Sequence, residues 1–101
     1  MICKYIKHDE SQEFILEGKL DQESYSEFDD FISLNYASGS DVVINVTGLS
    51  YISSVGLRSF IGLAKLVRND KKNIHTRAQE GSMVKQLIVL SGFVKLMPFI
   101  E

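Results

Sequence analysis

Two adjacent serines, Ser53 and Ser54, precede a predicted helix and have the clearest chemical potential in this chain. A serine hydroxyl at a helix start can accept a hydrogen bond from an N–H group that has no partner within the helix. The N–H groups of Val55, Gly56 and Leu57, with the positive end of the helix dipole, would also stabilise a phosphate on a serine there. The residues leave both uses open, because capping and phosphorylation are compatible.

Side chains suited to catalysis or metal binding are otherwise scarce. His8 and His75 fall on predicted strands without an obvious acid partner, and the chain has no Gly-x-Ser-x-Gly motif. Cys3 has no Cys or His at ligand spacing, and the phosphate-loop and dinucleotide motifs are missing. Asp29 and Asp30 fit the solvated face of a helix. We therefore expect a protein that is not an enzyme and that uses neither a metal nor a cofactor.

Composition narrows the class of protein further. The chain has 101 residues, of which 45% are hydrophobic and 24% charged, which favours one soluble domain spanning residues 1–101. A net charge of −2 and a pI near 5.6 argue against nucleic acid as a partner. No apolar run approaches the roughly 18 residues of a spanning helix, and we recognise no signal peptide. With a single cysteine, the expected location is the cytoplasm, without membrane insertion.

Charge is distributed unevenly along the chain. The first fifty residues hold three lysines and ten acids, whereas the remainder holds eight cations and three acids. Such an asymmetry produces either ordinary solvated helix faces or oppositely charged surfaces that orient a protein partner. The sequence alone leaves these alternatives open.

Alternating strand and helix patterns must position these residues. The predicted strands are Ile2–His8, Gln12–Leu20, Val42–Val46, Ile74–Ala78 and, as a final edge strand containing Pro98, Leu96–Ile100. The predicted helices cover residues 22–37, 55–69 and 82–91. Asp21 or Ser24 is the expected N-cap of the first helix, and Ser24 and Glu27 match a capping box.

This order predicts an α/β fold with a four- or five-stranded mixed sheet and helices packed on it. The β-branched run Val42–Val46 is typical of a strand buried on both faces, and residues 47–50 are expected to form a loop. Right-handed crossovers would bring the helix N-termini to the carboxyl edge of the parallel strands. The expected core residues are Val43, Ile44, Val46, Leu57, Phe60, Ile61, Ala64, Leu87 and Ile88.

Four segments together resemble a known family. They are Gly18–Asp21, Val42–Val46 followed by Leu49, Tyr51–Arg58, and Ser91–Leu96. In this order and spacing they are similar to the STAS domain, the family of bacterial anti-sigma factor antagonists, over nearly the whole chain. Ser53 stands where many members have Asp, and Val55 stands where Ser, Thr or Ala is usual.

The resemblance implies a partner-switching regulator of transcription. In that family the unphosphorylated antagonist binds an anti-sigma factor that is also a serine kinase. Phosphorylation of a serine at the start of the second helix releases it, and a PP2C-type phosphatase restores binding. Ser54 occupies the phosphoserine position, with Ser53 as the second choice.

The expected partner surface lies around that serine. It comprises Asp21, Ser50, Ser53, Ser54, Val55, Gly56 and Arg58. An alternative from a different class is a STAS-like subunit of a membrane lipid-transport complex that binds through the same edge without phosphorylation. A small-ligand-binding module is a third reading, although no residue selects a ligand.

Overall fold

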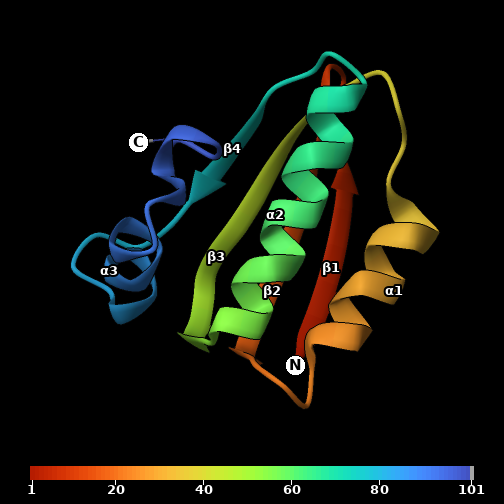
Figure 1. Cartoon of the computed structure of the whole chain (residues 1–101). Coiled ribbons are helices and arrows are strands. Elements are labelled where there is room, and N and C mark those ends of the chain that lie inside the picture. Colours follow the sequence, from red (N-terminus) through yellow and green to blue (C-terminus); the bar gives the residue numbers. More distant parts are fainter. Residues whose placement is uncertain (101) are drawn as a thin grey trace.

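The predicted alternation of strands and helices is present in the computed structural model, which describes residues 1–100 (Figure 1). The elements are β1 (Ile2–Lys7), β2 (Ser11–Leu20), α1 (Tyr25–Asn35), β3 (Asp41–Ile52), α2 (Ser54–Asn69), β4 (Ile74–Arg77), α3 (Met83–Leu90) and a short 3-10 turn, η1 (Phe93–Lys95). Residue 101, the last of the predicted domain 1–101, lies outside the described residues.

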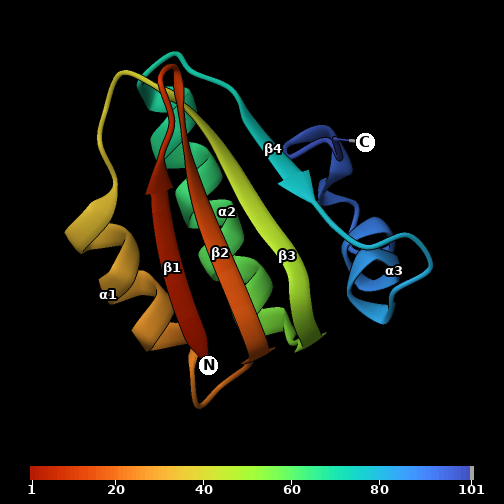
Figure 2. The same ribbon diagram turned by 180° about the vertical axis from the view of Figure 1, so that it is seen from behind.

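The sheet is mixed and has the strand order β1-β2-β3-β4. β1 pairs with β2 antiparallel, whereas β2, β3 and β4 run parallel. Because the parallel strands follow one another across the sheet, two right-handed crossovers place α1 and α2 on the same face. Figure 2 shows the opposite face of β1, β2 and β3 without a covering helix. The α/β prediction is therefore confirmed, with every helix-covered surface on one side.

One hydrophobic cluster lies between the sheet and its helices. Phe14 from β2, Phe28 from α1 and Phe60 from α2 are fully buried in it. The rings of Phe28 and Phe60 meet edge to face, with centroids 5.8 Å apart, an arrangement that aromatic pairs prefer. This contact joins the two helices above the sheet.

The single covered face corrects the expectation that Val42–Val46 is buried on both sides. Val42, Ile44 and Val46 are buried, whereas Val43 and Asn45 point to the uncovered face and are half-buried. Of the other predicted core residues, Phe60, Ala64 and Ile88 are buried, whereas Leu57, Ile61 and Leu87 are half-buried at the margin. The β-branched run reflects strand propensity rather than two-sided burial.

β3 is longer than predicted, because residues 47–50 continue the strand and do not form a loop. The pairing with β2 shifts register there, between Ile15 and Glu17. A Cβ at Gly48 would lie 2.8 Å from Cγ of Glu17, so glycine permits close approach of the two strands. The irregular pairing lets β3 reach Ile52.

The optional fifth strand is not formed. Leu96–Ile100 makes only an isolated parallel bridge between Phe99 and Thr76, and Phe93–Lys95 forms the 3-10 turn instead. Pro98 lacks an N–H, but its carbonyl accepts the Thr76 N–H at 2.9 Å. The segment covers the β4 edge without extending the sheet.

Candidate functional site

The carboxyl ends of β2 and β3 bring the predicted site together. Leu20 and Ile52 pair at the ends of these strands, so Asp21 and Ser53 leave the sheet side by side. The backbone N–H of Ser53 donates a 2.9 Å hydrogen bond to the carbonyl of Leu20. Residues more than thirty positions apart in the sequence are thereby fixed at one edge, as the parallel topology predicts.

The two serines have different environments. Ser53 is the N-cap of α2, and its Oγ accepts a hydrogen bond from the Gly56 N–H at 3.2 Å. Ser54 is the first helical residue and is exposed. Within residues 1–100 its hydroxyl makes no hydrogen bond to another protein group. Capping therefore belongs to Ser53, which leaves the hydroxyl of Ser54 available to other molecules.

Gly56 is buried, and its position explains how close α2 comes to the sheet. A Cβ at this residue would lie 2.7 Å from the carbonyl oxygen of Leu20 and 2.8 Å from Cγ of the same residue. The glycine thus allows the first turn of α2 to pack on the end of β2. Gly56 therefore fixes the position of Ser54 by packing against the end of β2. It does not provide open space beside Ser54.

The Asp21 turn is held by its own hydrogen bonds. The carboxylate of Asp21 accepts the Glu23 N–H at 3.0 Å. The hydroxyl of Ser24 donates to the carbonyl of Lys19 at 2.7 Å and accepts the Asp21 N–H at 3.0 Å. Ser24 is the N-cap of α1 by position, but its side chain bonds no helix N–H. The predicted capping box with Glu27 is therefore wrong, because the Ser24 hydroxyl is used in the preceding turn.

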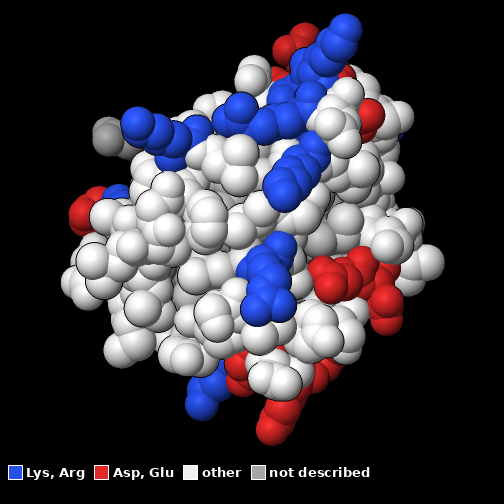
Figure 3. Space-filling view, in the orientation of Figure 1, with Lys and Arg blue, Asp and Glu red and all other residues white. Residues whose placement is uncertain are grey.

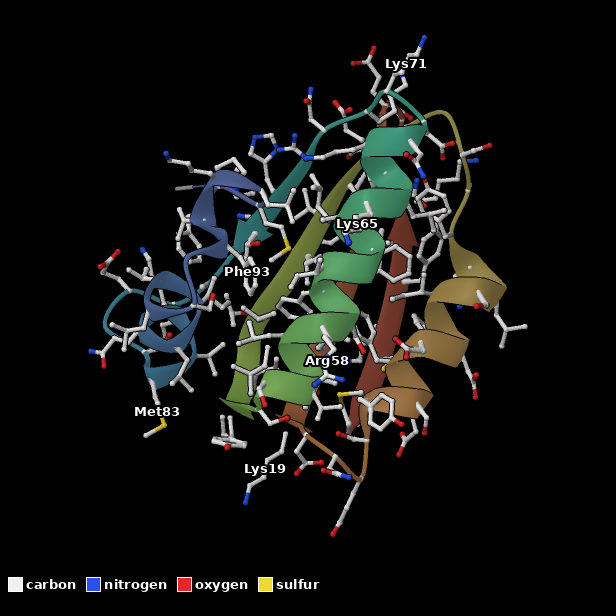
Figure 4. All side chains as sticks on the ribbon, viewed as in Figure 1. Lys19, Arg58, Lys65, Lys71, Met83 and Phe93 are labelled. Atoms are coloured by element: carbon white, nitrogen blue, oxygen red, sulfur yellow. The ribbon has the colours of Figure 1, made fainter. Side chains whose placement is uncertain are left out.

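The remaining predicted residues frame the start of α2. Ser50 is exposed on β3 and donates to the carbonyl of Gly18 at 3.1 Å. Val55 is half-buried, and Arg58 is exposed one turn after Ser54 (Figure 4). Val55 and Arg58 line a groove of about 530 Å³ between α1 and α2. No sequence motif pointed to this groove, although the three- and four-residue spacing of Val55, Arg58, Gly62 and Leu66 was a signal that these residues share one helix face.

Of the residues considered for catalysis, His8 lies toward the opposite end of the sheet, whereas Cys3 pairs with Leu16 nearer the carboxyl end of β2. His8, expected to lack an acid partner, has its Nε2 3.0 Å from Oε1 of Glu13 on the uncovered face of the sheet. Burial would raise the pKa of Glu13, but hydrogen bonds from His8 and Asn45 and the charge of Arg77 together lower it. Burial and the nearby Glu27 charge raise the pKa of the Cys3 thiol, which opposes thiolate formation.

Residues 1–100 contain neither a candidate metal cluster nor a helix that could span a membrane. No group of three or more His, Cys, Asp or Glu side chains is arranged to hold a metal ion in this part of the chain. Among the same residues, every helix is too short or too polar to cross a lipid bilayer.

The sequence and the fold correspond to a known family. A family model described as "Mlab, STAS domain" matches residues 3–98, which is nearly the whole chain. The chain belongs to the STAS domain family. This STAS domain is 30% identical over 71 residues to an "Anti-sigma-B factor antagonist" of Staphylococcus epidermidis, and the match covers 69% of the chain. The chain spans 66% of the length of the curated relatives it matches.

Solved structures share the fold of this STAS domain. The crystal structure of an anti-sigma factor antagonist from Mycobacterium paratuberculosis superposes with a TM-score of 0.84 at 18% identity, covering 97% of this chain and 83% of that one. The unphosphorylated form of the anti-sigma factor antagonist SpoIIAA gives a TM-score of 0.77 at 16% identity, covering 99% and 89%. The architecture of the sheet and its helices is therefore that of the STAS fold.

Proposed function

We propose that this STAS domain is an anti-sigma factor antagonist that binds its partner at the carboxyl edge of β2 and β3. The observation that carries the proposal is the division between the two serines: Ser53 caps α2, and the exposed Ser54 hydroxyl has no hydrogen-bond partner among residues 1–100. The names of the relatives support the antagonist and do not favour the lipid-transport subunit. The proposed role is therefore the binding of a protein partner rather than catalysis.

We propose Ser54 as the phosphorylation site. Two of the three N–H groups expected to face a phosphate are already used, because Gly56 donates to Oγ of Ser53 and Leu57 donates to its carbonyl. The Val55 N–H and the helix dipole therefore supply the local stabilisation. A phosphate adds roughly −1.5 to −2 charges at an exposed position. The fold should tolerate this charge, whereas a partner docked there would have to desolvate it.

The proposed partners are an anti-sigma factor that is also a serine kinase and a PP2C-type phosphatase that reverses its action. In this scheme the protein works in the cytoplasm. The partner surface consists of Ser54 with the neighbouring Ser50, Val55 and Arg58, held in place by Asp21, Ser53 and Gly56. Asp21 and Ser53 contribute through side-chain oxygens that accept backbone N–H groups, and Gly56 contributes through its close approach to Leu20.

The test combines a mass measurement with matched serine variants. Intact-mass analysis of the protein from its native host should reveal a phosphate that is lost in Ser54→Ala and retained in Ser53→Ala. Ser54→Asp should keep the melting temperature and weaken binding to the host anti-sigma factor at least about tenfold, near 1.4 kcal/mol. If only Ser53→Ala abolishes phosphate incorporation, the site is Ser53. If neither serine carries phosphate and binding ignores both, the proposed switch is wrong.

A further inference from the structure

We propose that the exposed face of α2 is a docking surface for an acidic amphipathic helix of the protein partner. The surface consists of Arg58, Lys65 and Arg68, which we call the cationic stripe. This inference rests on the proposed function, because it assigns a chemistry to the partner that binds beside Ser54. It extends the contact surface from the start of α2 along the full helix.

The stripe is a geometric consequence of spacing on α2. Arg58 and Lys65 are seven residues apart and share one face of a helix with 3.6 residues per turn, and Arg68 lies on its flank. Lys71 continues the cationic side chains just beyond the helix end (Figure 4). Residues 54–69 contain neither Asp nor Glu. Figure 3 shows basic side chains over α2 on one molecular face, in the orientation in which Figure 4 labels Arg58, Lys65 and Lys71.

The charge of the stripe is not neutralised within the described residues. The lysine ion pairs there are Lys4 with Glu17 and Lys85 with Glu80, and both lie on other elements. Arg58 and Lys65 form neither an ion pair nor a side-chain hydrogen bond within residues 1–100. The guanidinium of Arg68 donates to the carbonyl of Leu96 at 3.2 Å, which orients it but leaves its charge unpaired. Two cations are thus free to pair with carboxylates of another chain.

The groove beside the stripe supplies the apolar part of the surface. Its walls include the aromatic Tyr25 and the apolar Leu66. Although both side chains are large, they are 36% and 39% exposed, respectively. The groove has a volume of about 530 Å³, which accommodates one or two large side chains of a partner. A partner that places an apolar row of side chains in the groove and an acidic row over the cationic stripe has the pattern of an amphipathic helix.

The far wall of the groove fixes the orientation of this helix. Asp29 of α1 lines the groove opposite Arg58, and the helical residues of α1 include no Lys or Arg. Figure 3 shows acidic side chains on the α1 side of this face and basic side chains over α2. A carboxylate placed over α1 would be repelled. The complementary helix therefore carries acids on the α2 side, apolar residues in the centre and basic or neutral residues on the α1 side.

The stripe also links docking to Ser54. Arg58 follows Ser54 by four residues, and such pairs are neighbours on a helix surface. A phosphate on Ser54 would pair with Arg58 and would repel the acidic row of the docked helix. One modification would thus remove a cation from the stripe and add a repulsive charge beside it.

The probe is a synthetic 18-residue helical peptide with a Glu row, a Leu row and a Lys row in the order given above. Its affinity is measured by fluorescence anisotropy, and its site is mapped by amide shifts of the labelled full chain. Arg58→Ala and Lys65→Ala should each weaken binding by about fivefold, as expected for an exposed pair. Arg77→Ala, the matched control on the uncovered sheet face, should change affinity less than about twofold.

The outcomes separate this inference from the proposed function. Shifts confined to α2 and the groove, with loss of affinity for a peptide of scrambled order, support the stripe. Equal binding of the scrambled peptide, equal loss in Arg77→Ala, or no binding overturns it. Because the peptide assay contains no anti-sigma factor, such a failure leaves the Ser54 switch standing. Conversely, if the serine variants show that Ser54 is not the switch and the peptide still binds, only the proposed function is overturned.

Discussion

At the start of α2, two residues of the same type have distinct roles because the chain changes direction between them. Ser53 has an extended backbone, with φ −96° and ψ 173°, which aims its Oγ back at the Gly56 N–H. Ser54 is already helical, so its side chain points outward from the first turn. A one-residue difference in position therefore separates a structural hydroxyl from an available one.

The matched alanine variants measure this separation. Ser53→Ala removes the acceptor of the Gly56 N–H and should lower the free energy of unfolding by about 1 kcal/mol. Ser54→Ala should change it by less than about 0.5 kcal/mol, because an exposed hydroxyl without a protein partner is lost. Urea denaturation of both variants at pH 7 provides the measurement. Equal losses would contradict the assignment of the cap to Ser53.

Glu13 makes folding stability depend on pH. Its folded pKa is lowered, since hydrogen bonds from His8 and Asn45 and the charge of Arg77 outweigh burial. A carboxylate with a lowered folded pKa stabilises the fold above the ordinary Glu pKa of about 4.3. That stabilisation disappears as the pH falls through the folded pKa. Protonation of Glu13 at low pH therefore weakens the fold on the uncovered face of the sheet.

Glu13→Gln should lower stability at pH 7 and reduce the loss of stability between about pH 4.5 and pH 3. Denaturation midpoints at several pH values measure both effects. Glu17→Gln is the matched control on the same strand, because its pair with Lys4 is exposed and contributes about 0–1 kcal/mol. An unchanged acid dependence in Glu13→Gln would show that the lowered pKa of Glu13 has no effect on folding.

At the scale of elements, the packing of α2 on the end of β2 determines where the proposed partner surface lies. The contact is made through Gly56 and the Leu20 backbone, which also accepts the Ser53 N–H. A displacement of the helix start would therefore move Ser54 and disturb the hydrogen bond that joins α2 to β2. Stability and site geometry depend on the same contact.

Two glycines of α2 give a direct comparison. Gly56→Ala should lower stability by about 1–3 kcal/mol, because the added Cβ would overlap the Leu20 carbonyl. Gly62→Ala, in the same helix, meets no atom within 4 Å and should raise stability by up to about 1 kcal/mol through helix propensity. Thermal or urea denaturation measures both changes. A stabilising Gly56→Ala would contradict the close approach of α2 to β2.

At the scale of the whole molecule, the helices cover one face of the sheet and leave the other open (Figure 2). Ile44 on β3 is fully buried under the helices, whereas Ile15 on β2 is half-buried on the open face. Both residues belong to interior strands, so they differ chiefly in what covers them. The layer architecture therefore predicts different costs for the same substitution.

Ile44→Ala should lower the free energy of unfolding by about 2–5 kcal/mol, from lost burial and the cavity that remains. Ile15→Ala should cost less than half as much, because water can fill the space on the open face. Urea denaturation with a common slope compares the two variants. A loss below 1 kcal/mol for Ile44→Ala, or equal losses for both, would contradict the burial described here.

The sequence by itself determined the order of the elements, the STAS resemblance and the edge where Asp21 and Ser53 meet. The order of the elements and the common edge depend on local periodicity and on the handedness of crossovers, which a single chain encodes in its near neighbours. The resemblance rests instead on the family-like motifs, such as Tyr51–Arg58. The choice of Ser54 as the modified residue also came from sequence and stays a proposal.

Only the tertiary structure decided which sheet face is open, how far β3 extends and why residue 56 is glycine. Val43 and Ile44 have similar side chains, and their burial differs because both crossover helices pack on one side. The contact of Gly56 with Leu20 joins segments 36 residues apart, and the groove between α1 and α2 also requires distant residues to meet. Local propensity contains no information on such distances, because they are fixed only when the layers pack.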